Sequence, residues 1–131
     1  MQGDNVLLIV SPNATKVSIH GSTTFSLTGR TSGTYAGLLI ASVSPNLKIS
    51  TGNPASFGGS SSSTFTGAFY FPNSDLDFYG GGSATNNLCA QLIAQKINLQ
   101  GNSYITDNGT GCGIFDAAGT SARRLLVRLI Q

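Results

Sequence analysis

The hydrophobic pattern along the chain repeats a short unit, in which two apolar residues flank one polar residue and a glycine follows. Because strand side chains alternate, both apolar residues share one face, and glycine forms the following corner without steric cost. One unit cannot bury its apolar face alone, whereas stacked copies bury a continuous core, as in a β-solenoid. The copies occupy residues 17–21, 25–29, 47–52 and 97–101, the third with one extra residue.

The central stretch, residues 66–80, reads TGAFYFPNSDLDFYG and predicts two short strands around a corner. Phe69 and Phe71 share one face of the first strand, and Leu76 and Phe78 share one face of the second. The PNSD sequence between them is typical of a turn, because proline fixes φ and both Asn and Asp bond to their own backbone. We therefore expect all four apolar side chains in the core.

Two further apolar runs predict buried strands. Residues 6–10 are short and bounded by turn residues, and residues 35–43 are apolar without clean alternation. The GGSSSS stretch at 58–63 predicts a surface loop, and residues 80–87 predict a second one. The segment 121–131 fits either the alternation of a strand or one face of a helix. We favour a final strand, because the preceding segments are strand-like.

Together these segments predict one all-β domain over residues 1–131, an irregular right-handed parallel β-helix, or β-solenoid. The alternative is an antiparallel β-sandwich, which also uses many short strands joined by turns. The Asn-Gly pair at 108–109 is the single strong two-residue hairpin signal. The scarcity of such hairpins favours the parallel solenoid.

The chain has few charges. Only 9% of its 131 residues are charged, against about a quarter in an average protein, and its net charge is +2. Only Arg123, Arg124 and Arg128 form a basic cluster, which is too small a footprint for nucleic-acid binding. These arginines could contact an acidic partner or a membrane surface. Alternatively, their charges could prevent the edge of the last strand from pairing with another molecule.

Asp75 and Asp77 are the one pair of carboxylates close in sequence. Such a pair can bind a cation or hydrolyse a glycoside, which gives one hypothesis of a polysaccharide-active enzyme. The simpler interpretation is a turn residue followed by an outward-facing strand residue, and His20 likewise fits an exposed strand position. We therefore expect a non-enzymatic protein with no catalytic residue, metal or cofactor.

Cys89 and Cys112 are the two cysteines of the chain. A disulfide between them would close a loop that stabilises the fold by roughly 3–4 kcal/mol. It would place the domain in the periplasm or outside the cell. The alternatives are two buried thiols or a metal site, and two cysteines with one histidine fall short of a structural zinc set. We favour the disulfide.

Tyr70 and Tyr79 alternate with the phenylalanines and therefore point away from the core. Exposed aromatic rings are what a carbohydrate-binding module would present, so these tyrosines are the candidate ligand contacts. Tyr35 and Tyr104 are the remaining tyrosines. A glycan-binding role is the alternative to a structural or interaction role.

Four blocks of the sequence together resemble the C-terminal β-rich domain of TadG-like proteins of the bacterial tight-adherence (Flp) pilus-assembly system. They are VSIHG at 17–21, GTYAGLLI at 33–40, the stretch GAFYFPNSDLDFYG at 67–80, and CAQLIAQKINLQGN at 89–102. The resemblance covers residues 17–112 and is most specific in the last two blocks.

The resemblance implies a non-enzymatic role at the cell envelope, in pilus assembly, anchoring or surface adhesion, with other pilus or envelope proteins as partners. TadG-like proteins carry an N-terminal membrane segment. This sequence has no run of about 18 apolar residues, and residues 6–10 are too short for a signal peptide. We therefore expect a domain excised from a larger membrane-anchored protein.

Overall fold

The computed structural model describes residues 2–19, 24–59, 63–80 and 90–101. These residues form an all-β structure with one short 3₁₀ helix, which confirms the prediction of an all-β fold. The elements are β1 (Gln2–Val6), β2 (Leu8–Ile9), β3 (Val17–Ile19), β4 (Ser26–Gly29), β5 (Leu38–Ala41), η1 (Ile49–Thr51), β6 (Ala55–Gly59), β7 (Thr64–Gly80) and β8 (Ala90–Gly101).

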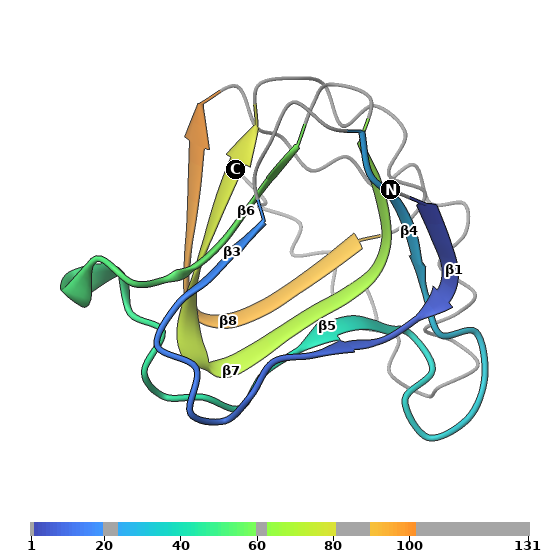
Figure 1. Ribbon diagram of the computed structural model, residues 1–131, viewed down its shortest axis with the longest axis horizontal. Helices are drawn as coiled ribbons and strands as arrows, with labels where there is room; N and C mark the ends of the chain where they lie inside the picture. The colour runs from blue at the N-terminus through green and yellow to red at the C-terminus, as the bar shows by residue number, and fades with distance from the viewer. Residues whose placement is uncertain (1, 20–23, 60–62, 81–89, 102–131) are drawn as a thin grey trace, which may run out of the picture.

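The strands form a parallel sheet that bends around three sides and nearly closes around a core (Figure 1). The first side contains β1, β4 and the start of β7. The second contains β2, β5, the middle of β7 and the first half of β8. The third contains β3, β6, the end of β7 and the second half of β8. Because every pair between these strands is parallel, the antiparallel sandwich is wrong for the described residues.

Equivalent residues of successive strands lie in register on the third side. Ala55 pairs with Leu76 and Leu76 with Ile97, at equal intervals along the chain. Phe57 and Phe78 form the next such column two positions later. Neighbouring strands are about 4.8 Å apart, so each column brings apolar side chains into contact along the stack.

The core is a cluster of phenylalanines drawn from all three sides. Phe65, Phe69 and Phe78 all belong to β7, yet their rings meet because β7 bends around them. Their ring centroids are 5.7–6.2 Å apart and the rings meet edge to face, a favourable aromatic geometry. Phe69, Phe71, Leu76 and Phe78 are all buried, as the sequence predicts.

The central corner is a bend within one continuous strand, so the predicted pair of separate strands is wrong. The register between β7 and β8 shifts between Phe71 and Asp75, where the strand turns from the second side to the third. Buried serines stabilise this corner. The Ser44 hydroxyl donates to the Ala14 carbonyl at 2.8 Å, and the Ser74 hydroxyl donates to the Ser44 carbonyl. These bonds satisfy polar groups that burial would otherwise leave without partners.

Residues 47–52 do not repeat the strand unit. Leu47 is buried, but η1 (Ile49–Thr51) follows, and Gly52 caps its C-terminal end with a left-handed φ of 73°. The Ile49 N–H donates to a carboxylate oxygen of Asp75 at 2.8 Å. This long-range bond, which local alternation does not reveal, fixes the start of the helix.

The runs at 6–10 and 35–43 are not continuous buried strands. The first is divided between β1 and β2, and the second contributes only β5 to the sheet. Ile9, Tyr35 and Val43 are 74%, 54% and 53% exposed. The sheet has a core on one face only, so part of each apolar run faces outward. In contrast, the structure adds β6, a strand that the hydrophobic pattern does not predict, and buries its Phe57 completely.

The predicted strand units at 17–21, 25–29 and 97–101 contribute to β3, β4 and β8. Leu27 is buried and Val17 packs against the core, whereas Ile97 and Leu99 of β8 remain 42% and 49% exposed. Several predictions lie outside the described residues: His20, most of the loops at 58–63 and 80–87, Cys89, Tyr104, the Asn-Gly pair at 108–109, Cys112, and the segment 121–131 with its three arginines.

Candidate functional site

The outer surface of the second side carries a row of apolar residues, one from each of its strands. Ile9, Ala41, Tyr70 and Ile93 follow one another in register across β2, β5, β7 and β8. Ile9, Tyr70 and Ile93 are exposed. We call these four residues the apolar row. It exists because the second side places outward positions of distant segments next to one another.

A groove of about 260 Å³ adjoins the apolar row. Tyr35 reaches it from the loop at 30–37, where the Ala36 N–H donates to the Gly33 carbonyl and the Leu38 N–H donates to the Tyr35 carbonyl. Gly33 has a φ of 85°, which glycine adopts without strain. The groove is lined mainly by apolar and aromatic side chains, including Ile9, Pro12, Tyr35, Val43 and Tyr70.

The third side carries a polar cluster around Asp77. This side chain is buried, with 4% exposure, and accepts hydrogen bonds from the Tyr79 hydroxyl at 3.0 Å and the Asn98 amide at 3.1 Å. The sequence predicts that Asp77 points away from the core, and it does. The side chain is nevertheless buried rather than exposed to solvent. Its neighbours on β7 and β8 enclose the carboxylate.

The bond to Asp77 raises the pKa of Tyr79 above its usual value of 10.0, because a phenol that donates to a carboxylate is stabilised in its protonated form. Partial desolvation and the negative charge of Asp77 act in the same direction, while Gln100 opposes them. Because the pKa of Tyr79 is higher in the folded than in the unfolded protein, protonated Tyr79 stabilises the fold at pH values below 10. This stabilisation is lost as the pH rises through the folded-state pKa.

The ionisation of Tyr79 can be isolated by titrating tyrosinate absorbance in wild type and in Tyr79→Phe and subtracting the second curve from the first. We expect the resulting Tyr79 curve to have a midpoint above pH 10. Asp77→Asn should move the midpoint of the corresponding Tyr79 difference down towards 10.0. A Tyr79 midpoint that is the same with Asp77 and with Asn at position 77 would contradict this assignment.

Asp75 and Asp77 therefore hold structural hydrogen bonds. Asp75 is buried, with 7% exposure, and accepts the Ile49 N–H. It is part of β7 rather than a solvent-exposed turn residue. Among the described residues, no group of three or more His, Cys, Asp or Glu side chains is arranged to hold a metal ion.

Tyr70 and Tyr79, the two candidate ligand contacts, lie on different sides of the sheet. Tyr70 pairs with Ala41 and Ile93 on the second side, whereas Tyr79 pairs with Gly58 and Gln100 on the third. The structure instead brings Tyr70 into one groove with Tyr35. A ligand contact by either tyrosine stays a prediction.

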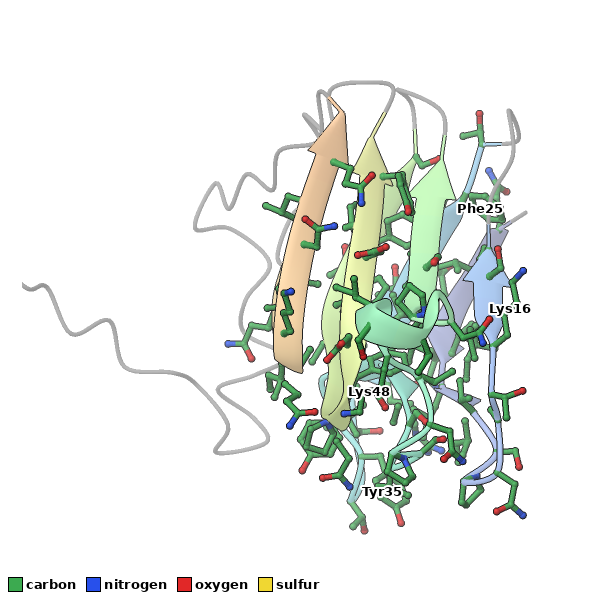
Figure 2. The ribbon with its side chains drawn as sticks, turned by 90° about the vertical axis from the view of Figure 1, so that its left-hand side faces the viewer. Lys16, Phe25, Tyr35 and Lys48 are labelled. Carbon is green, nitrogen blue, oxygen red and sulfur yellow. The ribbon has the colours of Figure 1, made fainter. Side chains whose placement is uncertain are left out.

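Three lysines from different segments lie along the corner between the second and third sides, an arrangement that the sequence pattern does not reveal. Lys16 precedes β3, Lys48 precedes η1, and Lys96 lies in β8 opposite Asp75. The Lys48 ammonium donates to the Asn73 carbonyl at 2.6 Å and to the Gln95 side chain, which holds it against the corner. Figure 2, which looks onto the third side, shows Lys16 and Lys48, with Tyr35 below them. We call these three lysines the lysine corner.

Comparison of the chain with protein-family models, with curated proteins and with solved structures gives no match. Within the described residues, no helix has the length and apolar character needed to cross a membrane.

Proposed function

We propose that this chain is a non-enzymatic structural and interaction domain of a bacterial cell-surface or pilus-assembly protein, built as an irregular right-handed parallel β-solenoid. In-register pairing of successive segments on three sides supports the solenoid. The right hand follows from the strong preference for right-handed connections between parallel strands. The loop at 30–37 and the helix η1 make the turns unequal in length.

The observation that carries the interaction role is the open edge at each end of the described stack. Within the described residues, β8 pairs only with β7, and β1 pairs only with β4. An unpaired strand edge offers a row of N–H and C=O groups to which a partner strand can add. On β8 this edge is accompanied by the exposed side chains of Ile97 and Leu99, which would give such a partner apolar contacts.

The envelope location rests on the resemblance to TadG-like proteins and on the disulfide predicted between Cys89 and Cys112. The sparse charge of the chain is compatible with this role. The partners would be other pilus or envelope proteins.

Site-specific photo-crosslinking in cells of the source organism tests this proposal. We expect a photoreactive residue in place of Leu99 to give a light-dependent adduct with another envelope protein, because Leu99 is exposed on β8, which pairs only with β7 among the described residues. The matched control replaces Ser50, which is also exposed but lies in η1, between the two ends of the stack. Adducts of equal yield at both positions, or none at position 99, would contradict the role of the edge.

A carbohydrate-binding module is the second candidate, and the groove that Tyr35 and Tyr70 share is the observation that favours it. Aromatic faces stack on sugars, but sugars also need hydrogen-bonding groups, and the groove has few. Glycan-array binding that is lost on Tyr70→Ala and retained on Tyr79→Ala would support this candidate over an interaction role.

A further inference from the structure

The second side concentrates exposed apolar side chains on one surface. Ile9, Tyr70 and Ile93 of the apolar row and Val43 at the end of β5 are exposed there, and Tyr35 adjoins them from the loop at 30–37. An apolar surface of this kind on a soluble domain is typical of a protein or membrane contact. Because the sheet supports the row, its side chains project together from one surface.

The exposed charged side chains along the edge of this surface are positive. The lysine corner follows one edge of the second side, and the half-buried Arg30 begins the loop that carries Tyr35. The acidic side chains nearest to the lysine corner, Asp75 and Asp77, are buried and hydrogen-bonded within the protein. Asp4 is exposed but lies on β1, on the first side. The second side is therefore complementary to a partner that combines apolar and anionic groups.

We propose that the second side binds an anionic lipid surface. The apolar row, Val43 and Tyr35 enter the boundary between headgroups and acyl chains, where aromatic and aliphatic side chains are favoured. The lysine corner meets the lipid phosphates, each lysine adding to the attraction. The surface is the outer face of the second side, whereas strand addition would use the backbone edge of β8 at the end of the stack. This proposal therefore does not depend on strand addition.

Sedimentation of the whole chain with vesicles tests the proposal. We expect binding to vesicles of phosphatidylcholine and phosphatidylglycerol at least about tenfold tighter than to phosphatidylcholine alone, and weaker at high salt. Ile9→Asp should lower the partition coefficient by roughly tenfold or more, since it removes an inserted side chain and adds a repelled charge. Lys16→Gln with Lys96→Gln should lower it roughly twentyfold, at about fivefold per lysine.

The matched control is Gln2→Asp with Thr24→Asp, which lowers the net charge by the same amount at exposed positions on the first side, one in β1 and one just before β4. This variant should stay within about twofold of wild type, apart from the long-range effect that salt screens. Circular-dichroism melts of each variant establish that it is folded.

The proposal is overturned if wild type does not bind the anionic vesicles, or binds neutral vesicles equally well. It is also overturned if the Ile9 variant or the lysine variant binds like the control. Displacement from vesicles by polyglutamate, with no effect of Ile9→Asp, would assign the lysine corner to an acidic protein instead. None of these results bears on crosslinking at Leu99, so the two proposals can fail separately.

Discussion

Replacing Phe69 by alanine is expected to lower the free energy of unfolding by about 3–5 kcal/mol. The Phe69 side chain has 0% exposure, and its ring lies 5.3 Å from that of Phe57, 5.7 Å from that of Phe65 and 6.0 Å from that of Phe78. These neighbours come from different sides of the sheet. Truncation would therefore leave a cavity that no single strand can close by shifting.

The control for this prediction is the next residue of the same strand, Tyr70, whose side chain faces solvent on the second side. Tyr70→Ala removes an aromatic ring of similar size from the same backbone but should cost clearly less than Phe69→Ala, because the Tyr70 side chain is 36% exposed and leaves no enclosed cavity. Urea unfolding followed by far-UV circular dichroism measures both variants. Equal losses for the two variants would mean that β7 does not hold its alternating faces as described.

Local alternation predicts the inward and outward faces of strands well in this chain. In β7 it assigns Phe69 and Phe71 to the core and Tyr70 to the surface, as the structure has them. The alternation holds because a shift by one residue would turn every apolar side chain of a one-sided strand from the core to solvent. It fails at residues 35–43, where the apolar run continues beyond the sheet at both ends and Tyr35 and Val43 become exposed.

Contacts between distant segments could not be predicted from the pattern. The start of η1 depends on a bond from Ile49 to Asp75, and the serine bonds join Ala14, Ser44 and Ser74 across three passages of the chain. Each of these bonds forms only when distant segments pair in the right register, and that register depends on the lengths of the loops between them. The neighbouring residues in sequence therefore decide which face of a strand is buried, whereas contacts with distant segments decide the structure of the corners.

The same distinction applies to the candidate site. The alternation of strand side chains predicts that Tyr70 and Tyr79 both lie on the outer surface. It does not predict the bend that separates them. The bend puts Tyr70 beside Tyr35 and puts Tyr79 beside Asp77. The lysine corner likewise cannot be seen in the sequence, because only the pairing of the strands places Lys16, Lys48 and Lys96 along one corner of the sheet.

Gly67→Ala is expected to lower the free energy of unfolding by roughly 3 kcal/mol or more, through two independent costs. Gly67 has a φ of 135°, which L residues rarely adopt. It also lies where β7 passes from β4 on the first side to β5 on the second. A Cβ at this position would come within 2.9 Å of the Leu39 Cβ and 3.2 Å of the Gly37 carbonyl oxygen.

Gly52→Ala separates the cost of the backbone from the cost of the clash. Gly52 also has a positive φ, 73°, but a Cβ there meets nothing within 4 Å. The expected loss is therefore about 1 kcal/mol, the cost of the left-handed conformation alone. Urea unfolding of both variants should give a loss for Gly67→Ala that exceeds the Gly52→Ala loss by at least about 1–2 kcal/mol, the usual cost of overpacking. Equal losses would show that the corner between the first and second sides has room for a side chain, and that β4, β5 and β7 pack less closely there than the structure places them.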